Sequence, residues 1–128
     1  MEIGNKMFVL LCMIFLHIID DYKLQAGVLN NLKQKSYWEQ NAPDELYKND
    51  YKWALLMHSF SWSFMVMLPI AIFMKFNINV EFILFFIYNI CLHCWIDDAK
   101  ANKKEINLIT DQICHLIQIV MTFLFVVV

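Results

Sequence analysis

The histidines and aspartates of this chain are the residues whose types and spacing could do chemistry. Three pairs of one His and one Asp are separated by four residues, which in a helix places both side chains on one face. The pairs are His17/Asp21, His93/Asp97 and Asp111/His115, and the fourth histidine is His58. Imidazole and carboxylate groups together suit Zn²⁺, Mn²⁺ or Fe²⁺. The sequence therefore predicts a metal site formed by His17, Asp21, His58, His93, Asp97, Asp111 and His115.

The elements that must position these residues are apolar. Of the 128 residues, 60% are hydrophobic and 17% are charged, against roughly 45–50% apolar residues in a soluble domain. Four long stretches have almost no charge, and each reaches or approaches the roughly 20 residues that cross a bilayer. We expect an all-α polytopic membrane protein, a four-helix up-down transmembrane bundle that forms a single domain over residues 1–128. The predicted spans cover about 7–25, 53–74, 80–98 and 110–128, with a long loop at about 26–52.

An up-down bundle would gather the polar residues of the spans in one layer. They lie at the end of the first and third spans and at the start of the second and fourth, with one histidine in each span. Ionisable groups inside a membrane cost about 2.5–3.5 kcal/mol each at its centre and are kept where they have partners. A divalent cation, zinc first and manganese or iron as alternatives, would relieve the repulsion among the carboxylates. Seven ligands are enough for two ions. In the alternative interpretation, each His/Asp pair is only a local hydrogen bond.

The lysines predict the orientation. All ten basic residues are Lys, and eight of them lie in or beside the loops that follow the first and third spans. The other side has only Lys6 and Lys75. The positive-inside rule therefore predicts a multi-pass protein of the inner (plasma) membrane, with both loops in the cytoplasm and both termini outside it. The net charge of −2 provides no basic surface for nucleic acid, so the expected partner is the lipid bilayer.

The long first loop carries its own pattern. Leu24, Val28 and Leu32 recur every four residues among polar ones, which predicts an amphipathic helix lying on the membrane surface. Asn41 ends this helix, and the following Pro43 and acidic residues predict a new helix start.

Four motifs in this order resemble a known family. They are His17-Ile-Ile-Asp-Asp-Tyr-Lys-Leu-Gln25, Leu55-Leu-Met-His58, His93-Cys-Trp-Ile-Asp-Asp-Ala-Lys100 and Asp111-Gln-Ile-Cys-His-Leu116. Over nearly the whole chain they are similar to the small bacterial and phage membrane proteins called domain of unknown function 3307. The resemblance implies signature positions at His17, Asp21, Gln25, His58, His93, Asp97, Lys100, Asp111, Gln112 and His115. Asp20, Cys94 and Cys114 depart from the family pattern. The family has no established activity, so the resemblance implies a site and not a reaction.

Three classes of function fit these observations. The first is a metal-dependent hydrolase acting on a membrane-associated, lipid-linked or phosphate-bearing substrate, because a bound metal can activate water near neutral pH. Its candidate catalytic and substrate-contacting residues are Asp21, Asp97, Lys100 and Gln25. The second is ion or proton transport, since intramembrane His and Asp also form relays. The third is an interaction protein in which the polar layer only sets the register of the bundle.

Overall fold

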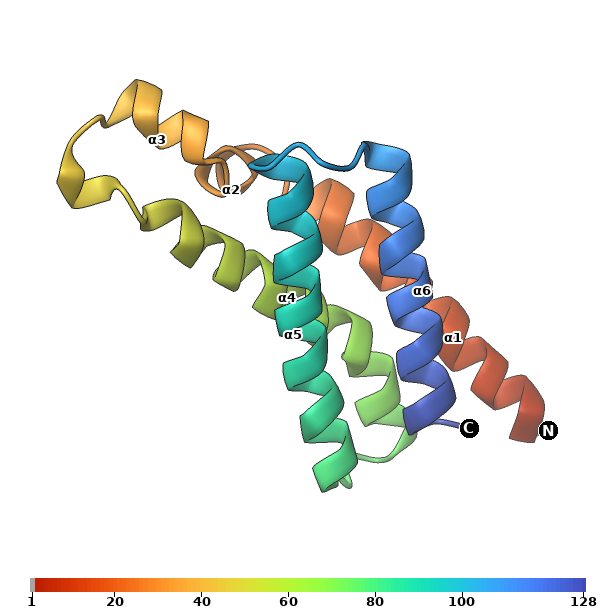
Figure 1. Ribbon diagram of the computed structural model, residues 1–128. Helices are drawn as coiled ribbons and strands as arrows, with labels where there is room; N and C mark the ends of the chain where they lie inside the picture. The colour runs from red at the N-terminus through yellow and green to blue at the C-terminus, as the bar shows by residue number, and fades with distance from the viewer. Residues whose placement is uncertain (1) are drawn as a thin grey trace.

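Four long helices form the bundle in the computed structural model, which describes residues 2–128 (Figure 1). They are α1 (Glu2–Ile19), α4 (Asp50–Phe73), α5 (Val80–Ala101) and α6 (Leu108–Val126). Each of the four, α1 and α4 together with short adjoining turns, is long and apolar enough to cross a membrane. The two termini lie at one end of the bundle, opposite the long connection between α1 and α4 (Figure 1). The predicted four-helix up-down bundle is confirmed.

The boundaries of the spans differ from the prediction by a few residues. The first helix begins at Glu2 rather than near residue 7, and α5 continues to Ala101. The starts of α5 and α6 are set by Asn79 and Asn107, whose side chains each accept a hydrogen bond from a backbone N–H of the first helical turn. Such caps satisfy donors that the helix itself leaves free. They place these two helix starts more sharply than hydropathy does.

The first helix ends in an unusual turn. A single π-helical turn, η1 (Asp20–Leu24), follows α1 directly, and the backbone N–H of Gln25 bonds to the carbonyl of Asp20. A π turn is wider than an α turn and is found often at functional sites. It changes the direction of the side chains that follow it relative to those of α1.

The surface segment, residues 25–49, connects the first two spans. It contains α2 (Val28–Leu32), α3 (Lys35–Asn41) and a 3₁₀ turn, η2 (Glu45–Tyr47). The sequence predicts one helix that ends at Asn41, whereas the structure has two, α2 and α3, and Leu24 is separated from them because it belongs to η1. The break is at Gly27, whose φ of +79° is a backbone conformation that favours glycine. In Figure 1 the segment lies across the end of the bundle away from the termini and projects to one side.

The half of the bundle nearest the termini holds the apolar core. Its buried members come from α1, α4 and α6 and continue to the residue after α6: Val9, Met13, Trp62, Val66, Ile70, Ile119, Phe123 and Val127. A small buried cluster of neutral polar side chains joins α5 to α6 beside this core. Asn89 donates to Thr122 over 2.9 Å and accepts from Gln118 over 2.8 Å. The core and this cluster stabilise the bundle at this end, and the buried ionisable side chains gather at the other.

Candidate metal centre

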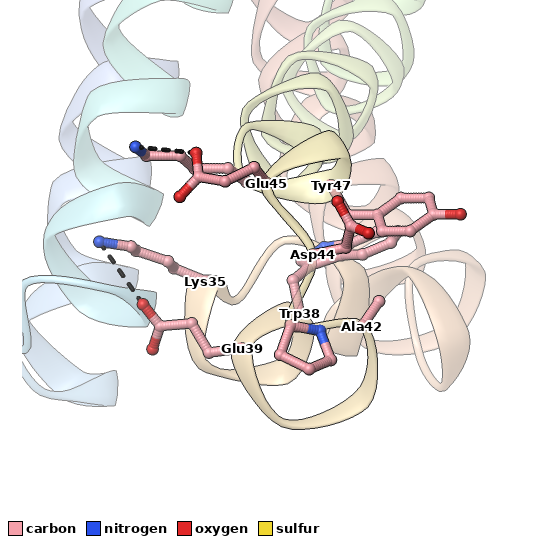
Figure 2. A pocket seen from close by; sticks show the side chains of 9 residues that line it. Lys35, Trp38, Glu39, Ala42, Asp44, Glu45 and Tyr47 are labelled. Atoms are coloured by element: carbon pink, nitrogen blue, oxygen red, sulfur yellow. Dashed lines mark hydrogen bonds and ion pairs between the residues drawn. The ribbon is translucent and has the colours of Figure 1, made fainter.

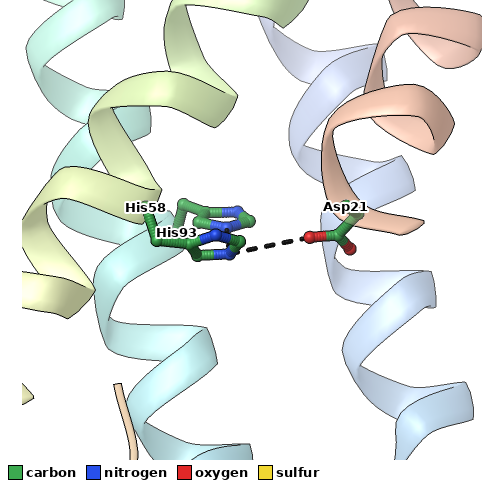
Figure 3. Close-up of side chains that lie close together, drawn as sticks. All are labelled: Asp21, His58 and His93. Carbon is green, nitrogen blue, oxygen red and sulfur yellow. Dashed lines mark hydrogen bonds and ion pairs between the residues drawn. The ribbon is translucent and has the colours of Figure 1, made fainter. Parts of the chain in front are cut away.

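Six of the seven predicted ligands converge where α4, α5, α6 and η1 meet. They form three overlapping groups of three, and within each group the donor atoms lie within 4.8 Å of one another. The groups are Asp21/His58/His93, His93/Asp97/His115 and Asp21/Asp111/His115. Figure 3 shows the first, with the Asp21 carboxylate directed at the two imidazole rings. We call these six residues the His/Asp centre.

Asp97 lies in the middle of the His/Asp centre. Its Oδ2 is 2.9 Å from Nε2 of His58, and its Oδ1 is 3.3 Å from Nε2 of His115 and 3.7 Å from Nε2 of His93. Ligand atoms around a tetrahedral zinc ion lie about 3.4 Å from one another, given bond lengths of about 2.0–2.2 Å. These three distances are close to that value, and the donor atoms of His93, Asp97 and His115 all lie within 4.8 Å of one another, so this group could hold one divalent cation, with His58 on the other oxygen of Asp97.

The facing rings of His58 and His93 indicate where lone pairs are available. Their Nε2 atoms are 3.0 Å apart, so both cannot carry a hydrogen that points at the other. The Nδ1 atoms of both rings, and that of His115, are buried without a hydrogen-bond partner among residues 2–128. No protein group among residues 2–128 therefore fixes the tautomer of these rings through Nδ1, so a tautomer with its proton on Nδ1 would present an Nε2 lone pair to a cation.

Asp111 forms the edge of the His/Asp centre toward the end of α5. Its Oδ1 is 3.3 Å from Nε2 of His115, one helical turn further along α6. Its Oδ2 accepts a hydrogen bond of 2.7 Å from the ammonium of Lys100, the residue predicted to contact an anionic substrate. The Lys100 side chain keeps 25% of its surface exposed, so it links the buried carboxylate to the membrane surface.

His17 lies beside the His/Asp centre but outside its three donor groups. Its Nδ1 accepts a 2.8 Å hydrogen bond from the indole N–H of Trp62, and its Nε2 lies 3.1 Å from Oε1 of Gln112. The same Gln112 side chain donates to Asp21 over 2.9 Å. His17 and Asp21 therefore meet through Gln112 and not directly as the spacing predicts, because the wide η1 turn separates them. With both nitrogens bonded to protein, His17 positions the neighbouring groups.

Gln25 does not reach the His/Asp centre. Its side-chain amide lies 3.3 Å from each carboxylate oxygen of Asp20, and Asp20 also accepts from the hydroxyl of Ser61 over 2.8 Å. These bonds tie the η1 turn to α4. The structure thus gives Gln25 a place in holding the turn that carries Asp21, whereas the sequence predicts a substrate contact.

Lys33 is a member of the site that the sequence analysis missed. It comes from the surface segment, yet it is only 6% exposed. Its ammonium donates to Oδ2 of Asp97 over 2.7 Å and lies 3.5 Å from Nε2 of His58. A lysine in a polar loop is normally solvated, so nothing in the local sequence marks it. A cation therefore already lies against the carboxylate at the middle of the His/Asp centre.

Comparison of the chain with protein-family models, with curated proteins and with solved structures gives no match. The resemblance to domain of unknown function 3307 stays a prediction from the motifs. The functional interpretation therefore depends on the geometry of the His/Asp centre.

A separate cavity of about 230 Å³ lies on the surface segment (Figure 2). Its stacked rings, Trp38 and Tyr47, have centroids 6.2 Å apart. Its charged side chains pair with one another, Lys35 with Glu39 and Lys48 with Glu45. The cavity shares no residue with the His/Asp centre, and its polar groups already have partners in the protein.

Proposed function

We propose that this chain is an integral membrane protein that binds a divalent cation in the His/Asp centre and hydrolyses a phosphate-bearing, membrane-associated substrate. The observation that carries the proposal is the approach of three imidazole Nε2 atoms, from His58, His93 and His115, to the single carboxylate of Asp97. Zinc is the first candidate, because mixed imidazole and carboxylate ligands at this spacing suit a tetrahedral ion.

The groups around these four residues suit hydrolysis. A divalent ion would supply Lewis-acid activation of water and of a phosphate oxygen. Asp21 is the best placed general base, because its side chain keeps 8% of its surface exposed, against 1% for Asp97 and 0% for Asp111. A general base must reach the water that attacks, and the more exposed carboxylate does so best. Lys100 supplies the partly exposed ammonium that an anionic substrate would meet first.

Transport is supported less well by the same geometry. The buried ionisable side chains among residues 2–128 all lie in or beside the His/Asp centre. Toward the termini the buried polar side chains are neutral, and Asn89, Gln118 and Thr122 form hydrogen bonds with one another. A proton or ion relay would need further ionisable or hydrated groups on this path. The arrangement favours a reaction at one end of the bundle over the transport of ions or protons through it.

The lysines support a cytoplasmic position for the end of the bundle that carries the His/Asp centre. The surface segment and the turn between α5 and α6 lie at the end of the bundle that carries the His/Asp centre, and eight of the ten lysines are on this side. The positive-inside rule assigns such a side to the cytoplasm. The substrate would then be a lipid-linked phosphate at the inner leaflet of the plasma membrane.

Metal analysis of the protein purified in detergent tests the first step. We expect close to one equivalent of zinc per chain after dialysis against zinc and then against buffer. We expect His93→Ala to lose it, while Cys91→Ala, two residues away on an exposed face of α5, keeps it. Equal metal content in the protein and in His93→Ala would overturn the proposal.

Phosphate release from lipid substrates tests the second step. The metal-loaded protein is given a lipid phosphomonoester, a lipid diphosphate and a phosphodiester lipid in mixed micelles. We expect metal-dependent release from at least one of them, and loss of that release in Asp21→Asn with the metal still bound. If the metal-loaded protein cleaves none of the three lipids, the proposed hydrolase activity is wrong and only the metal binding stands.

A further inference from the structure

Lys33 and a divalent cation would need the same atoms. The ammonium lies 2.7 Å from Oδ2 of Asp97 and 3.5 Å from Nε2 of His58. A zinc ion bound to these two atoms would lie about 2.0–2.2 Å from each, so the ion and the ammonium would be close neighbours of like charge. Both cannot hold this carboxylate oxygen at once.

The charges of the His/Asp centre favour exchange of one cation for the other. Three carboxylates, from Asp21, Asp97 and Asp111, face two ammonium groups, from Lys33 and Lys100. With neutral imidazoles this leaves one net negative charge. Adding a divalent ion with both lysines in place leaves one net positive charge, whereas adding it while Lys33 withdraws leaves none. Uncompensated charge is costly in a buried site, so the neutral arrangement is favoured.

The surface segment is built so that Lys33 can withdraw. The residues around Lys33 are held to the end of α5 by one side chain, that of Asn102. Its amide donates to the carbonyl of Lys33 over 3.1 Å, and its oxygen accepts from the backbone N–H of Lys35 over 2.6 Å. On the other side Gly27, with its positive φ, separates the segment from η1. A glycine therefore precedes the lysine, and Asn102 makes the side-chain hydrogen bonds to α5, while α2 itself packs against α4.

We infer that Lys33 is a tethered cation that occupies the His/Asp centre in the metal-free protein and that a divalent ion expels it. Its withdrawal uncovers Asp97 and His58, which Lys33 contacts from the side of the surface segment. Metal binding would therefore also open the His/Asp centre to substrate. The inference depends on the proposed metal site but not on hydrolysis.

Chemical modification of the unmutated protein tests the displacement directly. An N-hydroxysuccinimide acetate reacts with accessible amines, and mass spectrometry reports each lysine separately. We expect Lys33 to be protected without metal and to react at least tenfold faster with Zn²⁺ present. Lys35, whose side chain is 53% exposed and pairs with Glu39, is the internal control and should react equally in both states. Protection of Lys33 that persists when zinc is bound would overturn the inference.

A pair of variants tests the competition. Lys33→Met removes the tethered charge, and we expect it to bind Zn²⁺ at least tenfold more tightly than the unmutated protein in a titration. Lys35→Met makes the same change two residues away and should alter the affinity less than twofold. Equal or weaker binding by Lys33→Met, with zinc still bound by the unmutated protein, would refute the competition and leave the metal site standing. If no form takes up zinc, the proposed function fails and this inference fails with it.

Discussion

Trp62 donates its indole N–H to Nδ1 of His17 over 2.8 Å. This bond fixes the tautomer of His17, because the nitrogen that accepts cannot carry the proton. Nε2 then holds the hydrogen and donates to Oε1 of Gln112 at 3.1 Å. The amide nitrogen of Gln112 is thereby turned to the carboxylates of Asp21 and Asp111, at 2.9 Å and 3.0 Å. A tryptophan of the apolar core thus orients two carboxylates of the His/Asp centre.

Replacing this tryptophan should destabilise the protein. Trp62→Phe keeps an aromatic ring but leaves Nδ1 of His17 buried without a donor, which costs about 1–3 kcal/mol. We expect the free energy of unfolding in detergent to fall by about that amount. Trp95→Phe, at a position 64% exposed on α5, is the matched control and should change it little. Equal losses in the two variants would show that the hydrogen bond contributes nothing specific.

Asp97 should contribute more to the zinc affinity than the other ligands do. Asp97→Asn keeps the shape of the side chain and removes its charge. Groups that only support a ligand contribute about 10–100-fold in metal affinity, so we expect loss of the carboxylate to weaken zinc binding by more than about 100-fold. Asp50→Asn, at the start of α4, is the control in the same titration. Zinc binding by Asp97→Asn that matches the unmutated protein would exclude Asp97 as a ligand.

Lys100 should stabilise the metal-free protein more than the metal-loaded one. Lys100→Met leaves the buried Asp111 carboxylate without its 2.7 Å partner. Because Lys100 is partly exposed, the expected loss lies between the roughly 0–1 kcal/mol of surface pairs and the roughly 3–5 kcal/mol of buried ones. A zinc ion nearby replaces the missing charge, so zinc should raise the melting temperature of this variant more than that of the unmutated protein.

The control for Lys100→Met is Lys103→Met, because Lys103 lies 3.9 Å from Asp98 and is about half exposed. The same melting curves, with and without zinc, should not distinguish Lys103→Met from the unmutated protein. An identical zinc response in both variants would mean that Asp111 lies too far from the bound ion to sense it.

The neutral polar cluster should affect stability and leave the metal alone. Asn89→Ala removes the amide that bonds to Thr122 and accepts from Gln118. Interhelical hydrogen bonds in membrane proteins contribute up to about 1–2 kcal/mol each, and we expect a loss of this size in denaturant titration. Asn77→Ala, in the exposed turn after α4, should lose less. Reduced zinc stoichiometry in Asn89→Ala would contradict the separation of the two polar regions.

The bundle and the convergence of its His and Asp residues could be predicted because both follow from periodicity. Four-residue spacing places His93 with Asp97 and Asp111 with His115 on shared helix faces, and alternating spans bring these faces to one end. The caps Asn79 and Asn107, which set the starts of α5 and α6, did not enter the prediction of the spans.

The remaining features depend on tertiary structure. Lys33 is buried because the surface segment packs against α4 and bonds to Asn102 at the end of α5, and the local sequence, Asn31-Leu-Lys-Gln-Lys35, does not indicate this burial. The role of Trp62 depends on which face of α4 meets α1, and every face of α4 is apolar in composition. The η1 turn has no sequence signal that we can name, yet it decides that His17 and Asp21 meet through Gln112.

The distribution of the His/Asp centre over all four spans has a consequence for membrane insertion. A ribosome delivers α1 first and α6 last, so the carboxylates on η1 and α5 are made before their partners on α6. Until that helix arrives, Asp21 lacks Gln112 and Asp97 lacks His115. We therefore expect the three earlier spans to remain in the insertion machinery, or at the hydrated edge of the bilayer, until α6 has been made and the polar layer can close.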